Sequence, residues 1–367
     1  MGIKVAAVFG TRPEAIKLAP VCRMLADATD IVYCGIDTGQ HQHLMPPIMD
    51  RFGVPPAISL NLMTPGQTLI ELESRMLKEL SAVFRRESPD VVMVQGDTAT
   101  AVMAAWAAFH EGVAVAHVEA GLRTYRPQSP FPEETFRRAI ATFSRWNFAP
   151  SVTAAQNLLR EAVPGKIVVT GNPVVDALAQ ILRWGLPSKT YFPIKEKAFR
   201  IIATIHRREN HPYLPDILGA LDALARHPYV ELFFPLHPNP AIVQTVHRLW
   251  NESPVHIIEP LEYEAWIHFM QTADLIISDS GGVQEEAPIL GVPLLVAREE
   301  TERPEVITEG YGLLVGHDRD TIVTTAIKIL RGQVRFKQGS PYGDGKAARR
   351  IVYYLLHPNA PVDGLSM

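Results

Sequence analysis

The sequence predicts an α/β protein with two Rossmann-like domains, each built on a parallel sheet, and a central cleft between them. Two observations lead to this fold class. Short apolar segments typical of buried strands alternate with helical patterns, and this alternation occurs in two successive halves. Strands that are connected through helices form parallel sheets with both faces covered. The join between the halves is expected near residues 171–195, where prolines and glycines accumulate.

The residue pattern assigns elements to both halves. The expected strands of the first half cover residues 5–9, 31–35, 91–94, 113–118 and 167–169, and its expected helices cover 14–28 and 99–109. The expected strands of the second half cover residues 201–204, 231–234, 255–258, 275–277 and 293–296. Its expected helices lie near 214–226, 240–250, 263–271 and 283–290.

The composition fits a globular protein and argues against nucleic-acid binding. The chain has 367 residues, which is long enough for two domains of ordinary size, and 47% of them are hydrophobic. Its formal net charge is −4 and its pI is about 6.4, whereas nucleic-acid binders usually carry a basic excess. We therefore expect no nucleic-acid partner.

The predicted location is the cytoplasm. Cys22 and Cys34 occur in apparent core segments without metal-ligand spacing, which is typical of buried thiols in a reducing compartment. Lys4 is followed directly by a strand-like segment, so we expect no signal peptide. The most apolar long segment, residues 99–109, is too short to cross a bilayer. We expect neither membrane association nor a metal site.

The segment SDSGGVQEEAP, residues 278–288, contains a predicted anion site. A buried strand turns into a helix there through Ser-Gly-Gly at 280–282. Such a turn leaves unpaired backbone N–H groups at the positive end of a helix dipole, an arrangement that suits a phosphate. Of the next carboxylates, Glu285 and Glu286, one is expected to bind a ribose diol. The alternative is an ordinary turn followed by a solvated acidic face.

The motif GTRPEAIK, residues 10–17, begins the first expected helix. Thr11 and Glu14 match a capping box, in which a threonine and a glutamate three residues later satisfy each other's backbone N–H groups. The box does not explain Arg12 and Lys17, because the helix dipole disfavours cations at this end. A bound anion would explain them, and a charged surface is the alternative.

Carboxylates follow expected strands of the first half. Asp97 lies in the motif QGDT, where either it or Thr98 could simply cap the next helix. Glu119 directly follows a buried strand, and a buried charge needs a partner, for which Arg123 is the structural alternative. Glu133 lies in the proline-bounded motif PFPEE. Ligands of parallel sheets bind at the carboxyl ends of the strands, so these groups are candidates for chemistry.

Polar motifs also follow strands of the second half. His206 lies in THRREN and could act as an acid or base near neutral pH. His237 begins the motif HPNP, and Arg303 lies in TERPE after the last expected strand. Each motif is weak evidence by itself. Together, a carboxylate cluster in one half and a histidine with an anion-binding turn in the other predict a shared site.

This set of motifs resembles the non-hydrolysing UDP-N-acetylglucosamine 2-epimerases over nearly the whole chain. The motifs are, in order, GTRPEAIK, TGQH, QGDT, HVEAGLRT, PFPEE, THRREN, HPNP, SDSGGVQEEAP, TERPE and PYGDGKAARRI. The resemblance implies the GT-B architecture and the interconversion of UDP-GlcNAc and UDP-ManNAc. It also implies a cytoplasmic homodimer that uses no nicotinamide cofactor.

The resemblance also implies the domain limits. The first domain would cover residues 1–172 and the second, UDP-binding domain residues 173–349. A C-terminal helix at about 350–367 would pack back on the first domain.

Residue by residue, the resemblance assigns roles to several side chains. Those matching the family's catalytic positions are Asp97, Glu119, Glu133 and His206. Those implied to bind the nucleotide sugar are Arg12, Ser280, Gly281 and Gly282 for the diphosphate, Glu286 for the ribose, Trp266 near the uracil, and Lys17 and Arg303 in the remaining site.

The chain departs from the family pattern in two places. Phe136 replaces a polar residue in the motif that contains Glu133. Many bacterial members bind a second UDP-GlcNAc as an activator, and His43 and Gly66 replace a glutamine and an arginine that contribute there. The remaining candidates for this second site are Gln40, Arg207 and His237. We therefore predict that activation by substrate is weak or absent.

The chemistry explains why these groups are needed. Carbon 2 of the sugar has no adjacent carbonyl to acidify its C–H bond, so direct proton removal would be slow. We expect the bond from carbon 1 to the diphosphate to break first, or together with proton loss, which leaves 2-acetamidoglucal. Re-addition of UDP and a proton on the other face of carbon 2 completes the epimerisation. Three alternatives are a glycosyltransferase of the same architecture, a hydrolysing epimerase and a catalytically silent UDP-sugar sensor.

Overall fold

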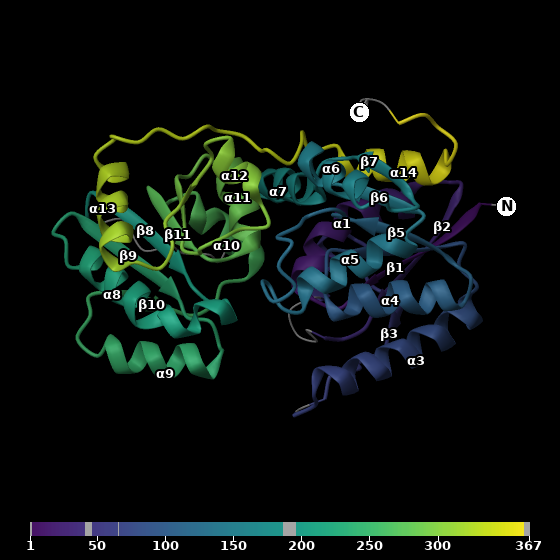
Figure 1. The fold of residues 1–367 in the computed structure, drawn as a ribbon, viewed down its shortest axis with the longest axis horizontal. Coiled ribbons are helices and arrows are strands. Elements are labelled where there is room, and N and C mark those ends of the chain that lie inside the picture. The colour runs from purple at the N-terminus through teal and green to yellow at the C-terminus, as the bar shows by residue number, and fades with distance from the viewer. Residues whose placement is uncertain (1, 41–45, 65, 186–195, 363–367) are drawn as a thin grey trace. The chain divides into compact units, whose positions relative to one another are not determined.

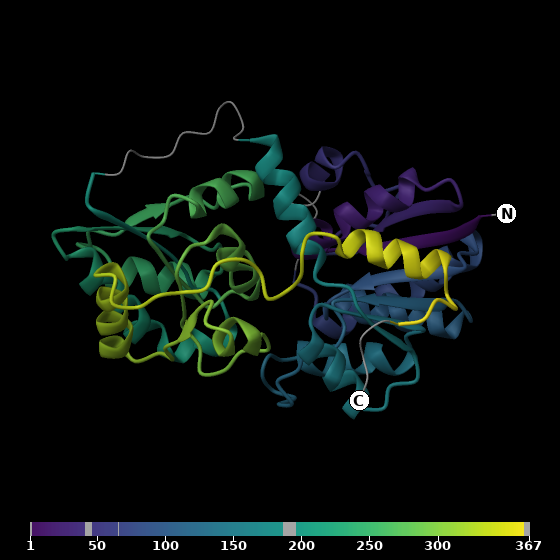
Figure 2. The same cartoon turned by 90° about the horizontal axis from the view of Figure 1, so that it is seen from above.

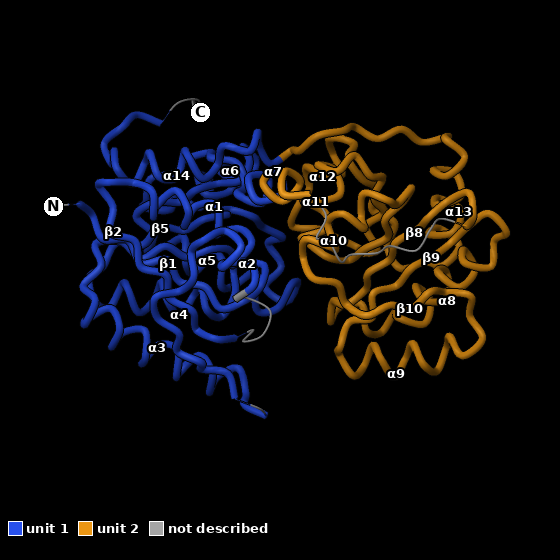
Figure 3. The backbone as a smooth tube through the Cα atoms, turned by 180° about the vertical axis from the view of Figure 1, so that it is seen from behind, with its two compact units in different colours: residues 1–179, 342–367 blue, residues 180–341 orange. Residues whose placement is uncertain are grey.

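The computed structural model describes residues 2–40, 46–64, 66–185 and 196–362 (Figure 1). The chain forms two compact units, residues 1–179 with 342–367 and residues 180–341 (Figure 3). Each unit is an α/β structure with its own parallel sheet. The predicted α/β fold class is therefore confirmed.

The first unit contains a seven-stranded parallel sheet in the order β3-β2-β1-β4-β5-β6-β7. Its strands are β1 (Ile3–Phe9), β2 (Ile31–Asp37), β3 (Ile58–Ser59), β4 (Val91–Gln95), β5 (Ala114–Val118), β6 (Trp146–Ala149) and β7 (Lys166–Val169). The order reverses between β1 and β4, as in dinucleotide-binding folds. The carboxyl ends of these two neighbouring strands therefore lie side by side.

Helices cover both faces of this sheet. The helices in this part of the chain are α1 (Arg12–Asp27), α2 (Pro46–Arg51), α3 (Leu69–Glu87), α4 (Ala99–His110), α5 (Glu133–Phe143), α6 (Val152–Arg160), α7 (Pro173–Trp184), which extends into the second unit, and α14 (Ala347–Leu356). One core packs α3 and α4 against alternate residues of the central strands, and Ile140 of α5 joins it. α14 packs against α1 on the opposite face (Figure 2).

The second unit repeats this topology with six strands in the order β10-β9-β8-β11-β12-β13. Its strands are β8 (Phe199–Thr204), β9 (Val230–Pro235), β10 (His256–Ile258), β11 (Leu275–Ser278), β12 (Leu294–Val296) and β13 (Leu313–Leu314). Its helices are η1 (Arg208–Tyr213), α8 (Leu214–Ala225), α9 (Pro240–Leu249), α10 (Tyr263–Met270), α11 (Gly281–Leu290), α12 (Pro304–Thr308) and α13 (Arg319–Leu330).

Alternation along β9 shows why both faces of this sheet are apolar. Leu232 and Phe234 enter the core that contains α8, α9 and α13. Phe233 points to the other face, where its ring meets Phe269 of α10 edge-on at 5.4 Å between centroids. Successive strand residues point to opposite faces, so a strand covered by helices on both sides needs a continuous apolar run.

Every strand predicted from the sequence is present, with bounds that differ by a few residues. The structure adds elements that the sequence analysis did not assign, including β3, β6, α3, α5, α6, α7, α12, α13 and β13. The sequence of α3 does contain signals that predict a helix. Thr68 and Glu71 form a capping box, and buried Leu72, Met76 and Leu80 follow at helical spacing.

The division of the chain lies inside α7, between Ala179 and Gln180, a few residues beyond the predicted limit at 172. The helix that returns to the first unit is α14, and its N-terminal N–H groups at Ala347 and Ala348 donate to Asp176 of α7, each at 3.1 Å. Among the described residues, no helix is long and apolar enough to cross a membrane.

Candidate active site

In each unit the candidate residues gather where the strand order reverses. In the first unit, Arg12 and Lys17 lie on α1, which follows β1, and the loops after β4 and β5 carry Asp97 and Glu119. In the second unit, the loops after β8 and β11 carry His206 and the Ser-Gly-Gly turn. Ligands of open parallel sheets bind outside the carboxyl ends of the strands at such points.

The start of α1 confirms the capping box predicted at Thr11 and Glu14. One carboxylate oxygen of Glu14, Oε2, accepts from the backbone N–H groups of Gly10 at 3.0 Å and Thr11 at 2.7 Å. The other oxygen, Oε1, accepts from the Thr98 hydroxyl at 2.6 Å. Burial raises the pKa of Glu14 to about 7, although these hydrogen bonds act in the opposite direction.

Lys17 points from α1 to Glu119, and the two form a buried ion pair. Asn172 also donates to Glu119, at 2.7 Å. The predicted alternative that Arg123 partners Glu119 is wrong, because Arg123 pairs with Glu161 at 2.8 Å. The φ angle of Glu119 is 65°, a region in which residues other than glycine are uncommon. Such a backbone persists only where its surroundings hold it, and it is frequent at functional sites.

Asp97 is bound by Arg137 of α5, a residue that the sequence analysis did not single out. Thr98, rather than Asp97, caps α4 by accepting from the N–H of Ala101 at 3.0 Å. Arg137 also lies 3.5 Å from Glu134. Glu133, the first residue of α5, is half-buried one helical turn before Arg137. Arg137 follows Glu133 by one helical turn, and this spacing could have identified Arg137 as a charge on the same face of the helix.

Gln40 lies near the same edge of the first sheet. Its side-chain oxygen accepts from the Thr100 hydroxyl at 3.1 Å, and Thr100 also bonds Thr38 at 2.9 Å. Of the two departures from the predicted second site, His43 lies outside the described residues. Gly66 is exposed, with a φ of 76°.

In the second unit, the Ser-Gly-Gly turn opens α11 as predicted. Ser280 is the N-cap residue, and Gly281 and Gly282 form the first turn of the helix. A Cβ atom added at Gly281 would lie 2.6 Å from Nη1 of Arg303, so only glycine fits without a shift of that side chain. At Gly282 the nearest atoms would be 3.8 Å away, so the protein itself leaves room there.

The two carboxylates after this turn are buried, so the predicted alternative of a solvated acidic face is wrong. Glu285 pairs with Arg303 at 2.7 Å. Glu286 accepts from the hydroxyl of Tyr263 at 2.7 Å, which holds its carboxylate near the start of α11. Trp266 lies one turn further along the same α10 helix as Tyr263 and is half-buried.

A buried charge network lies behind the turn. Arg303 contacts both Glu285 and Glu302. Glu302 in turn pairs with Arg298 at 2.9 Å and lies 3.7 Å from Arg207. Because a buried charge without a partner is very costly, this network fixes Arg303 against the Gly281 backbone.

His206 is held by Asp279, the residue before Ser280. The carboxylate of Asp279 accepts from the backbone N–H groups of His206 at 3.0 Å and Arg207 at 2.9 Å, and from Asn210 at 2.9 Å. The His206 ring stacks on His237 at 5.2 Å between centroids. Burial lowers the pKa values of both histidines, which favours their neutral forms.

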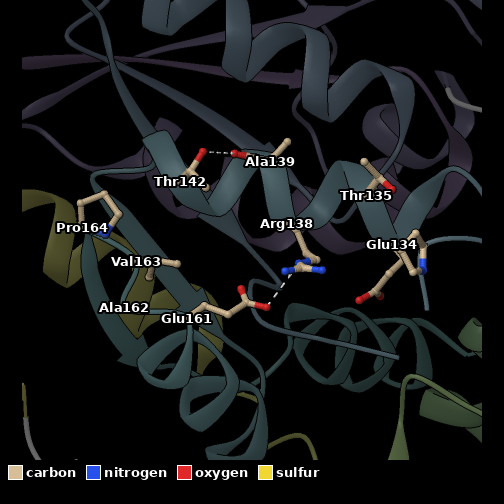
Figure 4. A pocket seen from close by; sticks show the side chains of 10 residues that line it. Glu134, Thr135, Arg138, Ala139, Thr142, Glu161, Ala162, Val163 and Pro164 are labelled. Atoms are coloured by element: carbon tan, nitrogen blue, oxygen red, sulfur yellow. Dashed lines mark hydrogen bonds and ion pairs between the residues drawn. The ribbon is translucent and has the colours of Figure 1, made fainter. Parts of the chain in front are cut away.

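A cavity of about 620 Å³ in the first unit lies between α5 and the C-terminal end of α6 (Figure 4). Its lining includes Arg138 and Glu161, which pair at 3.5 Å. None of the predicted site residues lines it. In the described part of the chain, no cluster of three or more His, Cys, Asp or Glu residues could hold a metal ion.

Comparison with known proteins identifies relatives along the whole chain. The family profile described as UDP-N-acetylglucosamine 2-epimerase matches residues 23–356. The UDP-N-acetylglucosamine 2-epimerase of Escherichia coli K12 is 40% identical over 96% of this chain and 98% of its own length.

Solved structures agree. The crystal structure of UDP-GlcNAc 2-epimerase from Neisseria meningitidis bound to UDP-GlcNAc has a TM-score of 0.91 and 38% identity, covering 97% of this chain and 100% of that one. A glycosyltransferase of kitacinnamycin, at a TM-score of 0.58 and 12% identity over 96% of this chain and 94% of that one, shares the fold alone. The architecture is therefore GT-B, and the chain belongs to the UDP-N-acetylglucosamine 2-epimerase family.

Proposed function

We propose that this protein interconverts UDP-GlcNAc and UDP-ManNAc by inverting carbon 2 of the sugar. The family match over nearly the whole chain carries this proposal. The geometry of the first unit supports it, because Asp97, Glu119 and Glu133 lie at or beside the carboxyl edge of the sheet, where chemistry is expected. The structural relative from Neisseria meningitidis was solved with UDP-GlcNAc bound.

The nucleotide is assigned mainly to the second unit. The N-terminus of α11 offers backbone N–H groups and the positive end of the helix dipole to the diphosphate at Ser280, Gly281 and Gly282. Glu286, oriented by Tyr263, accepts hydrogen bonds from the ribose hydroxyls. Trp266 on α10 stacks near the uracil.

Three cations complete the proposed substrate contacts. Arg303 lines the diphosphate turn through its contact with Gly281. In the first unit, Arg12 at the start of α1 binds the diphosphate, and Lys17 reaches the site from the same helix. A bound anion explains why Arg12 occupies the first turn of a helix whose dipole disfavours cations, whereas the charge of Lys17 is already paired with Glu119.

The proposed reaction proceeds by elimination and re-addition. The C1–O bond to the diphosphate breaks, and UDP leaves with the bonding electrons. A carboxylate takes the proton of carbon 2, so that a C1=C2 double bond forms and 2-acetamidoglucal remains. A second acid then protonates carbon 2 from the other face while UDP adds back to carbon 1. Asp97, Glu119 and Glu133 serve these proton transfers, and His206 with the α11 turn stabilises the leaving UDP.

The contacts around the carboxylates suit the proposed proton transfers. Arg137 holds Asp97, and Lys17 together with Asn172 holds Glu119, so each carboxylate is fixed from a different element. Fixed orientation matters because proton transfer requires the acid or base within hydrogen-bond reach of carbon 2.

The decisive test is proton NMR of UDP-GlcNAc with the purified protein in deuterated water. We expect the proton signal of carbon 2 to disappear as UDP-ManNAc forms, with traces of UDP and 2-acetamidoglucal. The variant Asp97→Asn should lose at least 100-fold in rate, on the order expected for removing a general acid or base. Asp27→Asn, an exposed change on α1, is the matched control. UDP release that depends on an added sugar acceptor, without exchange at carbon 2, would instead indicate a glycosyltransferase.

The protein is further proposed to act in the cytoplasm as a homodimer. The two cysteines, Cys22 and Cys34, are free and buried, as expected in a reducing compartment. Trp106 and Phe109 of α4 are 42% and 58% exposed and pack against Phe143 of α5. Large aromatic side chains that gather on a surface mark sites of protein association, and we place the dimer contact on this aromatic patch.

Substrate activation is proposed to be weak or absent. Gln40 in the first unit and Arg207 and His237 in the second are the retained candidates for a second substrate site, but Gly66 supplies no side chain to it. A rate curve against UDP-GlcNAc should therefore be hyperbolic. A clearly sigmoidal curve would contradict this expectation.

A further inference from the structure

The carboxylate of Glu14 makes more contacts than its capping box requires. The side chain is fully buried. Its Oε2 atom accepts from Gly10 N, Thr11 N and the Thr11 hydroxyl at 2.7–3.0 Å, and this completes the cap of α1. Its Oε1 atom accepts from the hydroxyl of Thr98, 84 residues away, at 2.6 Å. That last bond does nothing for the cap of α1.

A second capping box in the same unit shows what the cap alone needs. At the start of α3, Oε2 of Glu71 accepts from the backbone N–H of Thr68 at 2.7 Å and from its hydroxyl at 2.9 Å. Glu71 is exposed, and those hydrogen bonds lower its pKa. Glu14 has the same local motif, but burial raises its pKa. A fully buried carboxylate weakens the fold when it ionises, so capping alone does not account for its burial.

The bond to Thr98 joins two loops that carry proposed site residues. β1 and β4 are neighbours in the sheet, with Val5, Ala6 and Ala7 paired to Val91, Val92 and Met93. The loop after β1 leads into α1, which carries Arg12 and Lys17. The loop after β4 carries Asp97, and Thr98 follows it and caps α4. Glu14 therefore bonds at once to the first turn of α1 and to the residue beside Asp97.

We propose that Glu14 is a positioning residue that sets the spacing between Lys17 on α1 and Asp97 on the loop after β4. Lys17 follows Glu14 by three residues and lies on the same face of the helix, so fixing Glu14 fixes the direction from which Lys17 reaches Glu119. Glu14 touches no reacting atom. The proposal rests on the proposed epimerase function, because it assigns Asp97, Lys17 and Glu119 to the reaction.

The variant Thr98→Val removes the bond between the loops, Glu14→Gln removes the charge of the carboxylate, and controls at α3 account for the loss of a helix cap. The amide oxygen of glutamine can still accept from Gly10 and Thr11, and its NH₂ group can donate to the Thr98 oxygen, so Glu14→Gln removes the charge but can keep a reversed bond between the loops. Thr98→Val removes the other side of the same bond and also the cap of α4. Thr98→Ser keeps both and is the conservative rescue. Thr68→Val and Glu71→Gln are the matched controls at α3, because they disturb a capping box that joins no second loop.

The first readout is amide hydrogen exchange of the free protein, which does not depend on activity. Thr98→Val should raise the exchange rates of the Gly10 and Thr11 amides roughly tenfold, although the substitution is on another element. Thr98→Ser and Thr68→Val should leave these amides at the wild-type rate. Unchanged exchange in Thr98→Val would overturn the coupling between the two loops.

The second readout is steady-state kinetics of the epimerisation. Thr98→Val should lower kcat roughly 10- to 100-fold, since small misplacement of reacting groups is costly, and Glu14→Gln, which can keep a reversed bond, should lower it less. KM should stay within about threefold of wild type if UDP is held mainly by the second unit. Thr98→Ser should retain wild-type kcat, and Glu71→Gln should show no loss.

The outcomes distinguish this proposal from the proposed function. If the wild-type protein exchanges no proton at carbon 2, the proposed function fails, whereas the amide-exchange result still reports whether the two loops are coupled. If the wild type epimerises and Thr98→Val keeps its full kcat with unaltered exchange of the Gly10 and Thr11 amides, Glu14 is only a helix cap and the proposal is overturned. A loss of thermal stability in Thr98→Val that Thr68→Val matches, without a matching loss of kcat in Thr68→Val, supports positioning.

Discussion

At the scale of single residues, the candidate site is built from buried and half-buried charges whose partners come from distant parts of the chain. Lys17 pairs with Glu119, and Arg137 pairs with Asp97. Removing one member of such a pair leaves a buried charge without a partner, which typically costs about 3–5 kcal/mol of folding stability. The arrangement therefore fixes the direction of each carboxylate. It also means that a single substitution in the site can destabilise the fold as well as slow the reaction.

The raised pKa of Glu14 predicts a pH dependence of stability. A carboxyl group whose pKa is higher in the folded chain than in the unfolded chain binds more protons when folded. It therefore contributes stability at low pH that is lost as the pH rises from 4.5 to about 7. Across this window the stability of Glu14→Gln should improve relative to wild type, by on the order of 3 kcal/mol.

Urea unfolding at several pH values measures this difference. Glu71→Gln is the control with the opposite sign, because hydrogen bonds from Thr68 lower the pKa of Glu71. Its stability relative to wild type should fall as the pH rises through the ordinary range of a glutamate. Parallel pH profiles for wild type and Glu14→Gln would show that Glu14 titrates normally.

At the scale of elements, the proposed binding uses helix N-termini, and the residues before each helix decide where it begins. α11 starts at Gly281, directly after the N-cap residue Ser280 and the buried strand β11. This start places unsatisfied N–H groups at the carboxyl end of the sheet, where a diphosphate is proposed to bind. The absence of a side chain at Gly282 keeps the approach open.

We predict that Gly282→Ala weakens UDP binding without weakening the fold. The added Cβ meets nothing nearer than 3.8 Å in the protein, so thermal stability should be retained. The methyl group instead occupies the space through which the phosphate oxygens approach. Loss of one hydrogen bond to a charged group costs about 1.5–3 kcal/mol, so the Kd for UDP should rise about tenfold or more.

Gly219→Ala in the middle of α8 is the matched control for this prediction. Its nearest atom, in Arg319, would be 3.7 Å away, and the change should add roughly 0.5–1 kcal/mol of stability. Isothermal titration calorimetry should find its affinity for UDP equal to that of wild type. Equal affinities for Gly282→Ala and wild type would place the diphosphate elsewhere.

At the scale of the whole molecule, the two units share one topology, and different roles are proposed for them. Both sheets have the strand order of a dinucleotide-binding fold, and both reverse at a strand whose following loop carries candidate residues. The first unit supplies the three carboxylates proposed for proton transfer. The second unit supplies the helix turn and the histidine proposed for UDP.

The proposed homodimer gives a prediction at this scale. Phe109→Glu places a charge in the aromatic patch of α4 and α5 and should convert the dimer to a monomer, because burying an unpaired charge is costly. Val152→Glu on α6, where the valine is 55% exposed, should leave the dimer intact. Sedimentation equilibrium measures both. A Phe109→Glu protein that remains dimeric would move the contact away from this patch.

The sequence predicted the fold better than the contacts of the site. The alternation of apolar strands and helices can be recognised within short stretches of sequence, so β1, β4, β8 and β11 were predicted directly. β6 was not, because its four residues include the buried polar side chain of Asn147, which interrupts the apolar run. The GT-B assignment came from resemblance to a family.

Partners in the site could not be predicted from nearby sequence. Arg123 was the nearest cation to Glu119 along the chain, yet Lys17 is its partner, 102 residues away. The strand order brings α1 beside the end of β5, and no local pattern reports that order. Asn172, Tyr263 and Asp279 were missed for the same reason, because each acts by orienting a residue from another element.

The sequence by itself therefore determined the α/β class, the motifs that end the strands and the family to which those motifs point. Those features depend on periodicity and on residue types at short spacing, and both can be recognised in the sequence alone. Only the tertiary structure decided which charge faces which, that Glu285 and Glu286 are buried, and that Glu14 bonds to Thr98. Such contacts depend on strand order and helix placement, which bring residues far apart in the chain within hydrogen-bond distance.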